Sequence, residues 1–142
     1  MKTYDLDRFL DAQRFTYPIA LSEIQRGYKR SHWIWYIFPQ LKELGHSYNA
    51  QLYGIEDKDE AVAYIEHPVL SERLREITAA LLELPTDNPV CVMSSTIDAV
   101  KLCSCMTLFE AVTEDNAVFT AVIEKFFGGR RDEQTLALIN GT

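Results

Sequence analysis

The chain has 142 residues, with 14 Lys and Arg against 21 Asp and Glu, which gives a net charge of −7. Hydrophobic residues make up 47% and charged residues 25%, close to the average of globular proteins, so disorder is not expected. The acidic balance argues against nucleic acid or an anionic membrane surface as a partner, because both require a basic footprint. We therefore expect one domain over residues 1–142.

The sequence favours a cytoplasmic setting. The N-terminus lacks the apolar run of a signal peptide, and no stretch approaches the roughly 18 apolar residues of a membrane helix. Cys91, Cys103 and Cys105 are an odd number, and the last two point to opposite sides of a helix, so a disulfide framework is not expected. Paired zinc spacings are absent, and we expect no metal and no cofactor. The sequence carries no signal for an oligomeric state.

Helical spacing dominates the first half of the chain, and the breaks fall at proline and glycine. The predicted elements are a helix over 6–13 capped by Asp5, a helix over 17–27, a short helix over 32–38 capped by Ser31, a loop over 41–50, and one candidate strand over 50–55.

The second half predicts longer helices. Leu70, Leu74, Ile77 and Leu81 follow the 4, 3, 4 spacing of one buried helix face. In chain order we expect a charged surface helix over 57–66, a helix opened by Pro68, a break over 84–89, a long helix from a cap at Ser95 to about Thr113, a helix over 116–127, and a short last helix capped by Asp132. The fold class predicted is all-α, as a single compact domain of roughly eight helices.

Residues 29–40 do not follow a simple packing pattern. They contain both tryptophans, and the predicted helix is apolar all round, so it must be buried or line a groove. Two cations precede its N-terminus, where free backbone N–H groups favour an anion. One interpretation is a core helix with a solvated basic turn before it. The other is that Lys29, Ser31 and His32 bind an anionic group while Trp33 or Trp35 stacks on a ring.

The second unusual segment covers residues 94–109, where polar residues recur every three positions. On a helix, Asp98, Lys101 and Ser104 then form one contiguous patch. A lysine on an otherwise apolar helix is seldom buried without a partner, and Asp98 is the expected counter-ion of Lys101. The patch is therefore either a structural ion pair, or a site where Lys101 binds an anion and Ser104 donates a hydrogen bond.

These segments resemble the bacterial family catalogued as domain of unknown function 1810, some of whose members are labelled calpastatin-like. The specific part is the pattern Lys-x-Ser-His-Trp-x-Trp-x-x-Phe-Pro-Gln over 29–40, and residues 20–27, 44–47, 60–70 and 98–109 match as well. The resemblance implies a compact, mainly helical domain with no established activity. The family carries a Phe-Gly pair where this chain has Met93-Ser94, so the resemblance does not extend to that turn.

Two hypotheses for function remain. The first is a pocket for an anionic, nucleotide-like or ADP-ribose-like small molecule, on which Lys29, His32 and Lys101 converge. An enzymatic version would be a hydrolase with His32, Lys101 and Glu23 as catalytic candidates, with Glu23 as acid or base if burial raises its pKa. The second is a non-enzymatic protein–protein interaction domain that exposes its Trp, Tyr and Phe side chains. The predicted ligand-binding residues are Lys29, Ser31, His32, Trp33, Trp35, Gln40, His46, Ser47, Asp98, Lys101 and Ser104.

Overall fold

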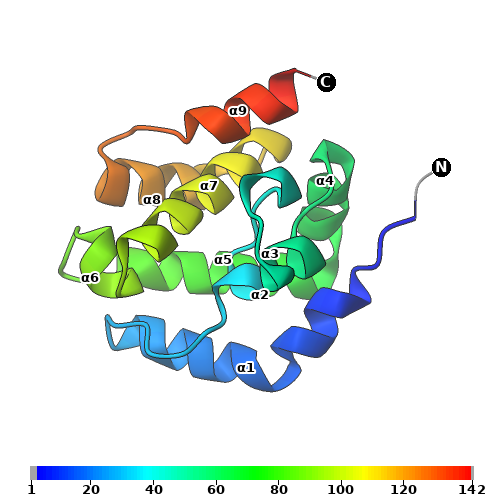
Figure 1. The fold of residues 1–142 in the computed structure, drawn as a ribbon. Coiled ribbons are helices and arrows are strands. Elements are labelled where there is room, and N and C mark those ends of the chain that lie inside the picture. The colour runs from blue at the N-terminus through cyan, green and yellow to red at the C-terminus, as the bar shows by residue number, and fades with distance from the viewer. Residues whose placement is uncertain (1–2, 142) are drawn as a thin grey trace.

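The computed structural model describes residues 3–141, and over this range the prediction of an all-α domain is confirmed (Figure 1). Nine helices lie within these residues, close to the predicted number. They are α1 (Asp7–Gln25), α2 (Ile34–Ile37), α3 (Tyr48–Tyr53), α4 (Lys58–Glu66), α5 (Pro68–Leu82), α6 (Pro89–Met93), α7 (Thr96–Val112), α8 (Ala117–Phe127) and α9 (Glu133–Asn140), with a short 3-10 helix η1 (Lys42–Leu44). None of these described helices is long and apolar enough to cross a bilayer.

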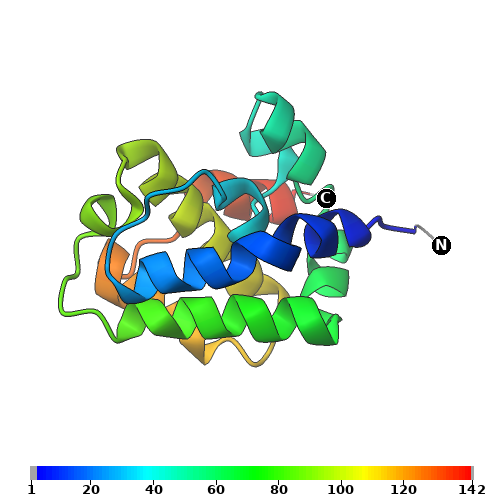
Figure 2. The ribbon, with the colours of Figure 1, turned by 90° about the horizontal axis from the view of Figure 1, so that it is seen from below.

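The helix α7 runs through the middle of the molecule, and most of the other helices pack around it (Figure 1). Figure 2 shows α1 and α5 side by side on one face of the molecule. Because α7 is surrounded, its residues 104–109 are all buried, and Leu102 is fully buried as well. The N-terminal turns of α7 are less covered, since Ile97 is 68% exposed and Val100 54% exposed.

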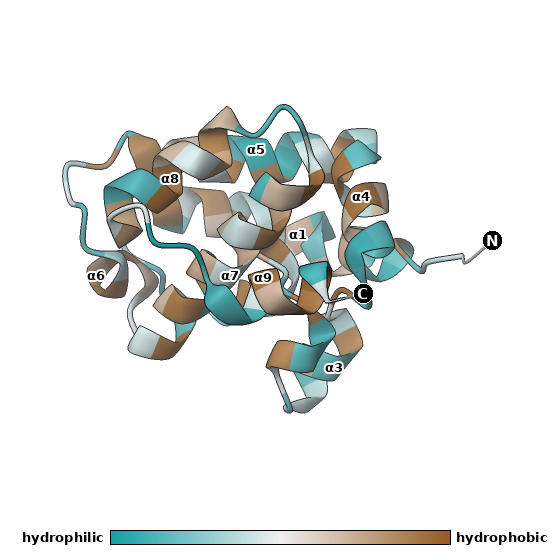
Figure 3. Cartoon of the chain, turned by 90° about the horizontal axis from the view of Figure 1, so that it is seen from above, coloured by the Kyte–Doolittle hydropathy of each residue, from teal (hydrophilic) through white to brown (hydrophobic). Residues whose placement is uncertain are grey.

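The apolar face predicted for α5 is confirmed. Leu70, Leu74, Ile77 and Leu81 are each at most 1% exposed. A fully buried side chain of this type stabilises a fold by about 1.5–3 kcal/mol, so this stripe is a large part of the core. Figure 3 shows brown and teal residues alternating along the helices, as amphipathic helices require.

The predicted helix caps at Ser95 and Asp132 are confirmed. The Ser95 hydroxyl accepts a hydrogen bond from the Asp98 amide at 3.0 Å and fixes the start of α7. A carboxylate oxygen of Asp132 accepts one from the Thr135 amide, also at 3.0 Å, and fixes the start of α9. Each cap satisfies a backbone N–H that the helix itself leaves without a partner.

The prediction of two helices before residue 27 is wrong, because α1 continues through Pro18. Pro18 is exposed, and the buried residues on both sides of it hold the helix against the core. This packing outweighs the hydrogen bond that a proline removes. Figure 1 shows α1 changing direction near its middle, as expected at a proline. Asp5 is not the cap, since Leu6 occupies that position without a side-chain hydrogen bond.

The segment between α1 and α4 also differs from the prediction. The expected helix over 32–38 is reduced to α2, and Ser31 does not cap it. The expected loop over 41–50 contains η1 and the start of α3, which Ser47 caps by accepting from the Ala50 amide. The candidate strand over 50–55 is wrong, since Ile55 forms only an isolated bridge with Leu41. The helix α6 lies at the end of the predicted break and was not expected.

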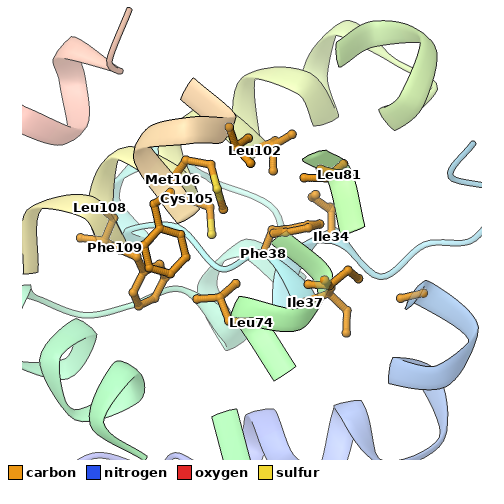
Figure 4. Packing of buried hydrophobic residues seen from close by; sticks show 14 of the residues in the cluster. Ile34, Ile37, Phe38, Leu74, Leu81, Leu102, Cys105, Met106, Leu108 and Phe109 are labelled. Atoms are coloured by element: carbon orange, nitrogen blue, oxygen red, sulfur yellow. The ribbon is translucent and has the colours of Figure 1, made fainter. Parts of the chain in front are cut away.

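Although short, α2 is an integral part of the core. Ile34, Ile37 and Phe38 are each at most 2% exposed. The close view in Figure 4 shows them in one cluster with side chains of α5 and α7, namely Leu74, Leu81, Leu102, Cys105 and Met106. The hydrophobic residues of the Trp-rich segment therefore anchor it, while Arg30 and His32 before α2 are exposed.

Candidate functional site

The segment that follows α1 is held in place by Glu23. One oxygen of its carboxylate accepts hydrogen bonds from the amides of Arg30 at 2.8 Å and Ser31 at 3.0 Å, and from the Trp33 indole at 2.9 Å. The other oxygen accepts from the Ser31 hydroxyl at 2.6 Å. Glu23 is only 8% exposed, so the carboxylate and its donors form one buried anchor.

Burial alone would raise the pKa of Glu23. The hydrogen bonds from Ser31, the Arg30 amide and Trp33 outweigh that effect and lower this pKa to about 2. The condition under which Glu23 could serve as a general acid or base is therefore not met. Glu23 is a permanent anion that shapes the segment after α1.

A second anchor joins the same segment to α7. The Lys29 ammonium lies 2.9 Å from a carboxylate oxygen of Asp98 and donates to the Ser31 carbonyl at 2.6 Å. It also lies 5.0 Å from the centre of the Trp33 ring. The Lys29 side chain is only 5% exposed, and a buried cation requires a counter-ion. The expected pairing of Asp98 with Lys101 is therefore wrong, because Asp98 pairs with Lys29.

Between these anchored parts lies a cavity of about 280 Å³, which we call the basic cavity. Arg30 and His32 contribute exposed side chains to it, and among the described residues neither side chain has a hydrogen-bond or ion-pair partner. Within residues 3–141 the amides of Thr96 and Ile97, at the start of α7, have no acceptor either. The residues that line the basic cavity are Lys29, Arg30, His32, Ile34, Trp35, Ser94, Ser95, Ile97 and Asp98.

Lys101 lies on the other side of Trp35. Its ammonium is 5.1 Å from the centre of the Trp35 ring, and no carboxylate of the described residues lies within 4.0 Å of it. Lys101 lines a second cavity of about 280 Å³, which we call the lysine cavity, together with Gln40, Leu44, Thr96, Ile97, Val100, Ser104, Asp132 and Gln134. The expectation that Lys29, His32 and Lys101 converge on one cavity therefore needs correction, since they line two adjacent cavities that share Ile97.

Two of the predicted ligand-binding residues are committed to the anchor instead. Ser31 gives both its amide and its hydroxyl to Glu23, and Trp33 gives its indole N–H to the same carboxylate. Trp33 is 0% exposed and cannot stack on a ligand. Trp35 is half-buried and lines the basic cavity, so it is the tryptophan that a ligand can contact.

The remaining predicted residues lie apart from the basic cavity. Gln40 and Ser104 line the lysine cavity, where the Ser104 hydroxyl donates to the Val100 carbonyl at 3.1 Å. His46 lines another hollow beside α9, and Ser47 caps α3. The interaction hypothesis loses part of its aromatic surface, because Trp33 and Phe38 are buried in the core.

Sequence reasoning did not include Ser94 and Ser95, in the turn between α6 and α7, among the ligand-binding residues. Ser94 has a left-handed backbone with φ of 66°, and both Ser94 and Ser95 line the basic cavity. The signal was present in the chain, because the resemblance carries a glycine at this position and glycine adopts this conformation at little cost. Among the described residues, no group of three or more His, Cys, Asp or Glu side chains is arranged to hold a metal ion.

Comparison with known proteins supports the fold and identifies the family. The structure is similar to the crystal structure of the conserved hypothetical protein Rv1873 from Mycobacterium tuberculosis, with 40% sequence identity and a TM-score of 0.94, over 98% of this chain and 99% of that one. No curated protein matches the chain. The family model described as "Protein of unknown function (DUF1810)" matches residues 3–139, and the chain therefore belongs to the DUF1810 family.

Proposed function

We propose that this protein binds a small molecule carrying a phosphate or carboxylate group in the basic cavity. The observation that carries the proposal is that Arg30 and His32 both line this hollow without a partner among the described residues. Asp98, the one carboxylate among the described residues that line the basic cavity, is bound to Lys29 and is not available to Arg30. The amides at the start of α7 add partial positive charge on the same side.

The size of the basic cavity limits the ligand. Ligand pockets usually measure roughly 300–1,000 Å³, and the basic cavity, at about 280 Å³, lies just below that range. A nucleotide-like ligand would place its phosphate near Arg30 and His32 and its ring against Trp35. A molecule as long as ADP-ribose would extend beyond this cavity.

We propose binding of the ligand without its hydrolysis. Glu23, the candidate general acid or base, accepts four hydrogen bonds from the protein and has a pKa of about 2. An acid or base for proton transfer at neutral pH needs a pKa near 7. Glu23 therefore acts by positioning Arg30, whose amide it binds.

A larger hollow beside α7 and α8 suits an anion less well. It measures about 1130 Å³ and is lined by four carboxylates, Asp87, Glu124, Asp132 and Glu133, against three cations, Lys125, Arg130 and Arg131. Two of these cations already have partners. Lys125 binds the carbonyl oxygens at the end of α5, and Arg131 binds Glu110.

The proposal is tested by thermal-shift measurements with a panel of phosphate, pyrophosphate, nucleoside monophosphates and dicarboxylates, followed by calorimetric titration of any hit. The double variant Arg30→Ala/His32→Ala should bind the hit at least tenfold more weakly, because charge-assisted hydrogen bonds are lost. The matched control is Arg14→Ala/Arg26→Ala, which removes two exposed arginines of α1 and its C-cap outside the cavity. The proposal is wrong if no anion of the panel binds, or if the double variant binds as the wild type does.

A further inference from the structure

Lys101 does not line the basic cavity, so the anion site proposed there does not account for its unpaired charge. Its side chain is half-buried on α7, yet within the described residues its only assigned contact is with the Trp35 ring. Among the described residues, the other buried or half-buried lysines have partners. Lys29 has Asp98, and Lys125 has the carbonyl oxygens that follow α5. Lys101 therefore has no counter-ion among the described residues, and an anionic group of a ligand would supply one.

The Trp35 side chain, which contacts Lys101, also has a hydrogen-bond donor without an acceptor among the described residues. Its indole nitrogen is buried and has no hydrogen-bond partner among the described residues. Such unsatisfied groups are rare in native proteins, and each calls for an explanation such as a functional role or a bound water or ion. Lys101 and Trp35 therefore form a pair of donors without acceptors, located where the two cavities adjoin.

The two cavities share one lining residue. Ile97 lines both the basic cavity and the lysine cavity. Trp35 lines the basic cavity and also a narrow hollow that contains Lys101 and Gln40. Ile97 is 68% exposed, so an apolar side chain lies between two regions that offer hydrogen-bond donors. Together they form a surface with cations at both ends and a hydrophobic middle.

We infer that the ligand has two anionic ends joined by an apolar or planar middle, with one end at Arg30 and His32 and the other at Lys101. The inference rests on the proposed function and names the class of molecule that it would bind. The middle of the ligand lies over Ile97 and beside Trp35. Asp132 also lines the lysine cavity, but its carboxylate is engaged by the Thr135 amide and hydroxyl at the start of α9. The negative charge of Asp132 is therefore partly offset by that helix terminus.

The test uses two series of probes, linear α,ω-alkanediol bisphosphates of increasing length and the alkyl monophosphates of equal chain length. In the wild type, the best bisphosphate should bind at least tenfold more tightly than its monophosphate. The affinity of the bisphosphates should also pass through a maximum with chain length, since only a linker that spans both cavities engages both ends. The monophosphates should show no such maximum. This measurement needs no variant.

The variant Lys101→Met keeps a long side chain beside Trp35 and removes the charge. In this variant, the best bisphosphate and its monophosphate should bind with affinities within twofold of each other. The affinity for the monophosphate should stay within twofold of that of the wild type. The control Lys58→Met removes an exposed lysine at the start of α4 and should change neither affinity. Circular dichroism and melting curves confirm that both variants fold, and the length series in the wild type remains decisive if Lys101→Met does not fold.

The possible failures are distinguishable. If monophosphates bind in an Arg30- and His32-dependent way but bisphosphates gain nothing, the two-ended ligand is excluded and the proposed function stands. The same conclusion follows if the bisphosphates gain affinity that does not depend on Lys101. If no probe of either series binds, and none of the panel above does, both proposals fall.

Discussion

The polar clusters at the two ends of α7 differ in whether their charged side chains are paired within the protein. At the C-terminal end, Glu110 accepts hydrogen bonds from Arg131 at 3.0 and 2.6 Å and from Thr120 at 2.6 Å. The Arg131 hydrogen bonds, opposed by burial and aided by Thr120, lower the pKa of Glu110. At the N-terminal end, Asp98 satisfies only Lys29, and the described part of the chain offers no counter-ion to Arg30.

This difference separates a structural cluster from a ligand site. Glu110 and Arg131 connect α7 to the loop before α9, and their charges balance one another within the protein. The N-terminal cluster has a balanced inner layer, made by Glu23 with its donors and by Lys29 with Asp98. Outside that layer lie Arg30 and Lys101, cations for which the described residues provide no counter-ion. The inner layer should therefore determine stability, and the outer cations should determine binding.

The largest expected effect is on the inner layer. Glu23→Gln should lower the free energy of unfolding by about 3 kcal/mol at pH 7, because a pKa of about 2 against an ordinary 4.5 corresponds to roughly that stabilisation. The folded-state pKa is lowered, so the contribution is complete above pH 4.5 and is lost as the pH falls towards 2. Urea unfolding of both proteins at pH 7 and pH 3 measures the change.

At pH 3 the difference between the wild type and Glu23→Gln should shrink by roughly half. Arg14→Ala, outside the anchor, serves as the control and should show no such pH dependence. An equal difference at the two pH values would mean that Glu23 contributes through packing alone, and the distinction between an ionised inner layer and free outer cations would then fail.

A smaller effect is expected at the other end of α7. Glu110→Gln weakens the charge-assisted hydrogen bonds from Arg131 and should cost about 1–2 kcal/mol of stability. Because Glu110 does not line the basic cavity, this variant should bind the anion as the wild type does. Arg30→Ala/His32→Ala should behave oppositely, with stability within about 0.5 kcal/mol of the wild type and weakened binding. Melting curves with and without ligand measure stability and binding for both variants. A loss of stability in both variants would contradict the assignment of Arg30 and His32 to binding alone.

The sequence predicts most of the fold because helical periodicity is a local signal. The stripe over Leu70 to Leu81 and the caps at Ser95 and Asp132 depend on residues within a few positions of each other. The errors at Pro18 and over 32–38 have non-local causes. Packing against α5 keeps α1 helical through the proline, and Glu23 holds Ser31 in a non-helical turn.

The site follows the same division. The sequence marks residues 29–40 and 94–109 as unusual, since both place polar residues against a simple packing pattern. It cannot reveal that Lys29 lies closer than Lys101 to Asp98, because the Lys29 pair joins residues far apart in the chain. Lys101 lies three residues after Asp98 on the same helix, so local spacing favours that pair. The fold instead brings the more deeply buried Lys29 next to Asp98.

The smallest effect concerns the turn that shapes the basic cavity. Ser94 has φ of 66°, a conformation that costs a residue with a Cβ roughly 1–2 kcal/mol. Glycine avoids this cost but loses more chain entropy on folding, about 0.5–1 kcal/mol. We therefore expect Ser94→Gly to stabilise the protein by about 0.5 kcal/mol, as the glycine of the family pattern suggests.

Ser95→Ala is the matched opposite in the same turn. It removes the hydroxyl that accepts from the Asp98 amide and should destabilise the protein by about 1 kcal/mol. Thermal melting should show a small rise for Ser94→Gly and a drop of a few degrees for Ser95→Ala. A drop for Ser94→Gly would mean that the serine side chain, and not only the backbone of the turn, stabilises the ligand end of α7. The contrast between this end and the fully paired Glu110 cluster would then be weaker, because a further polar group of the basic cavity would have a structural role.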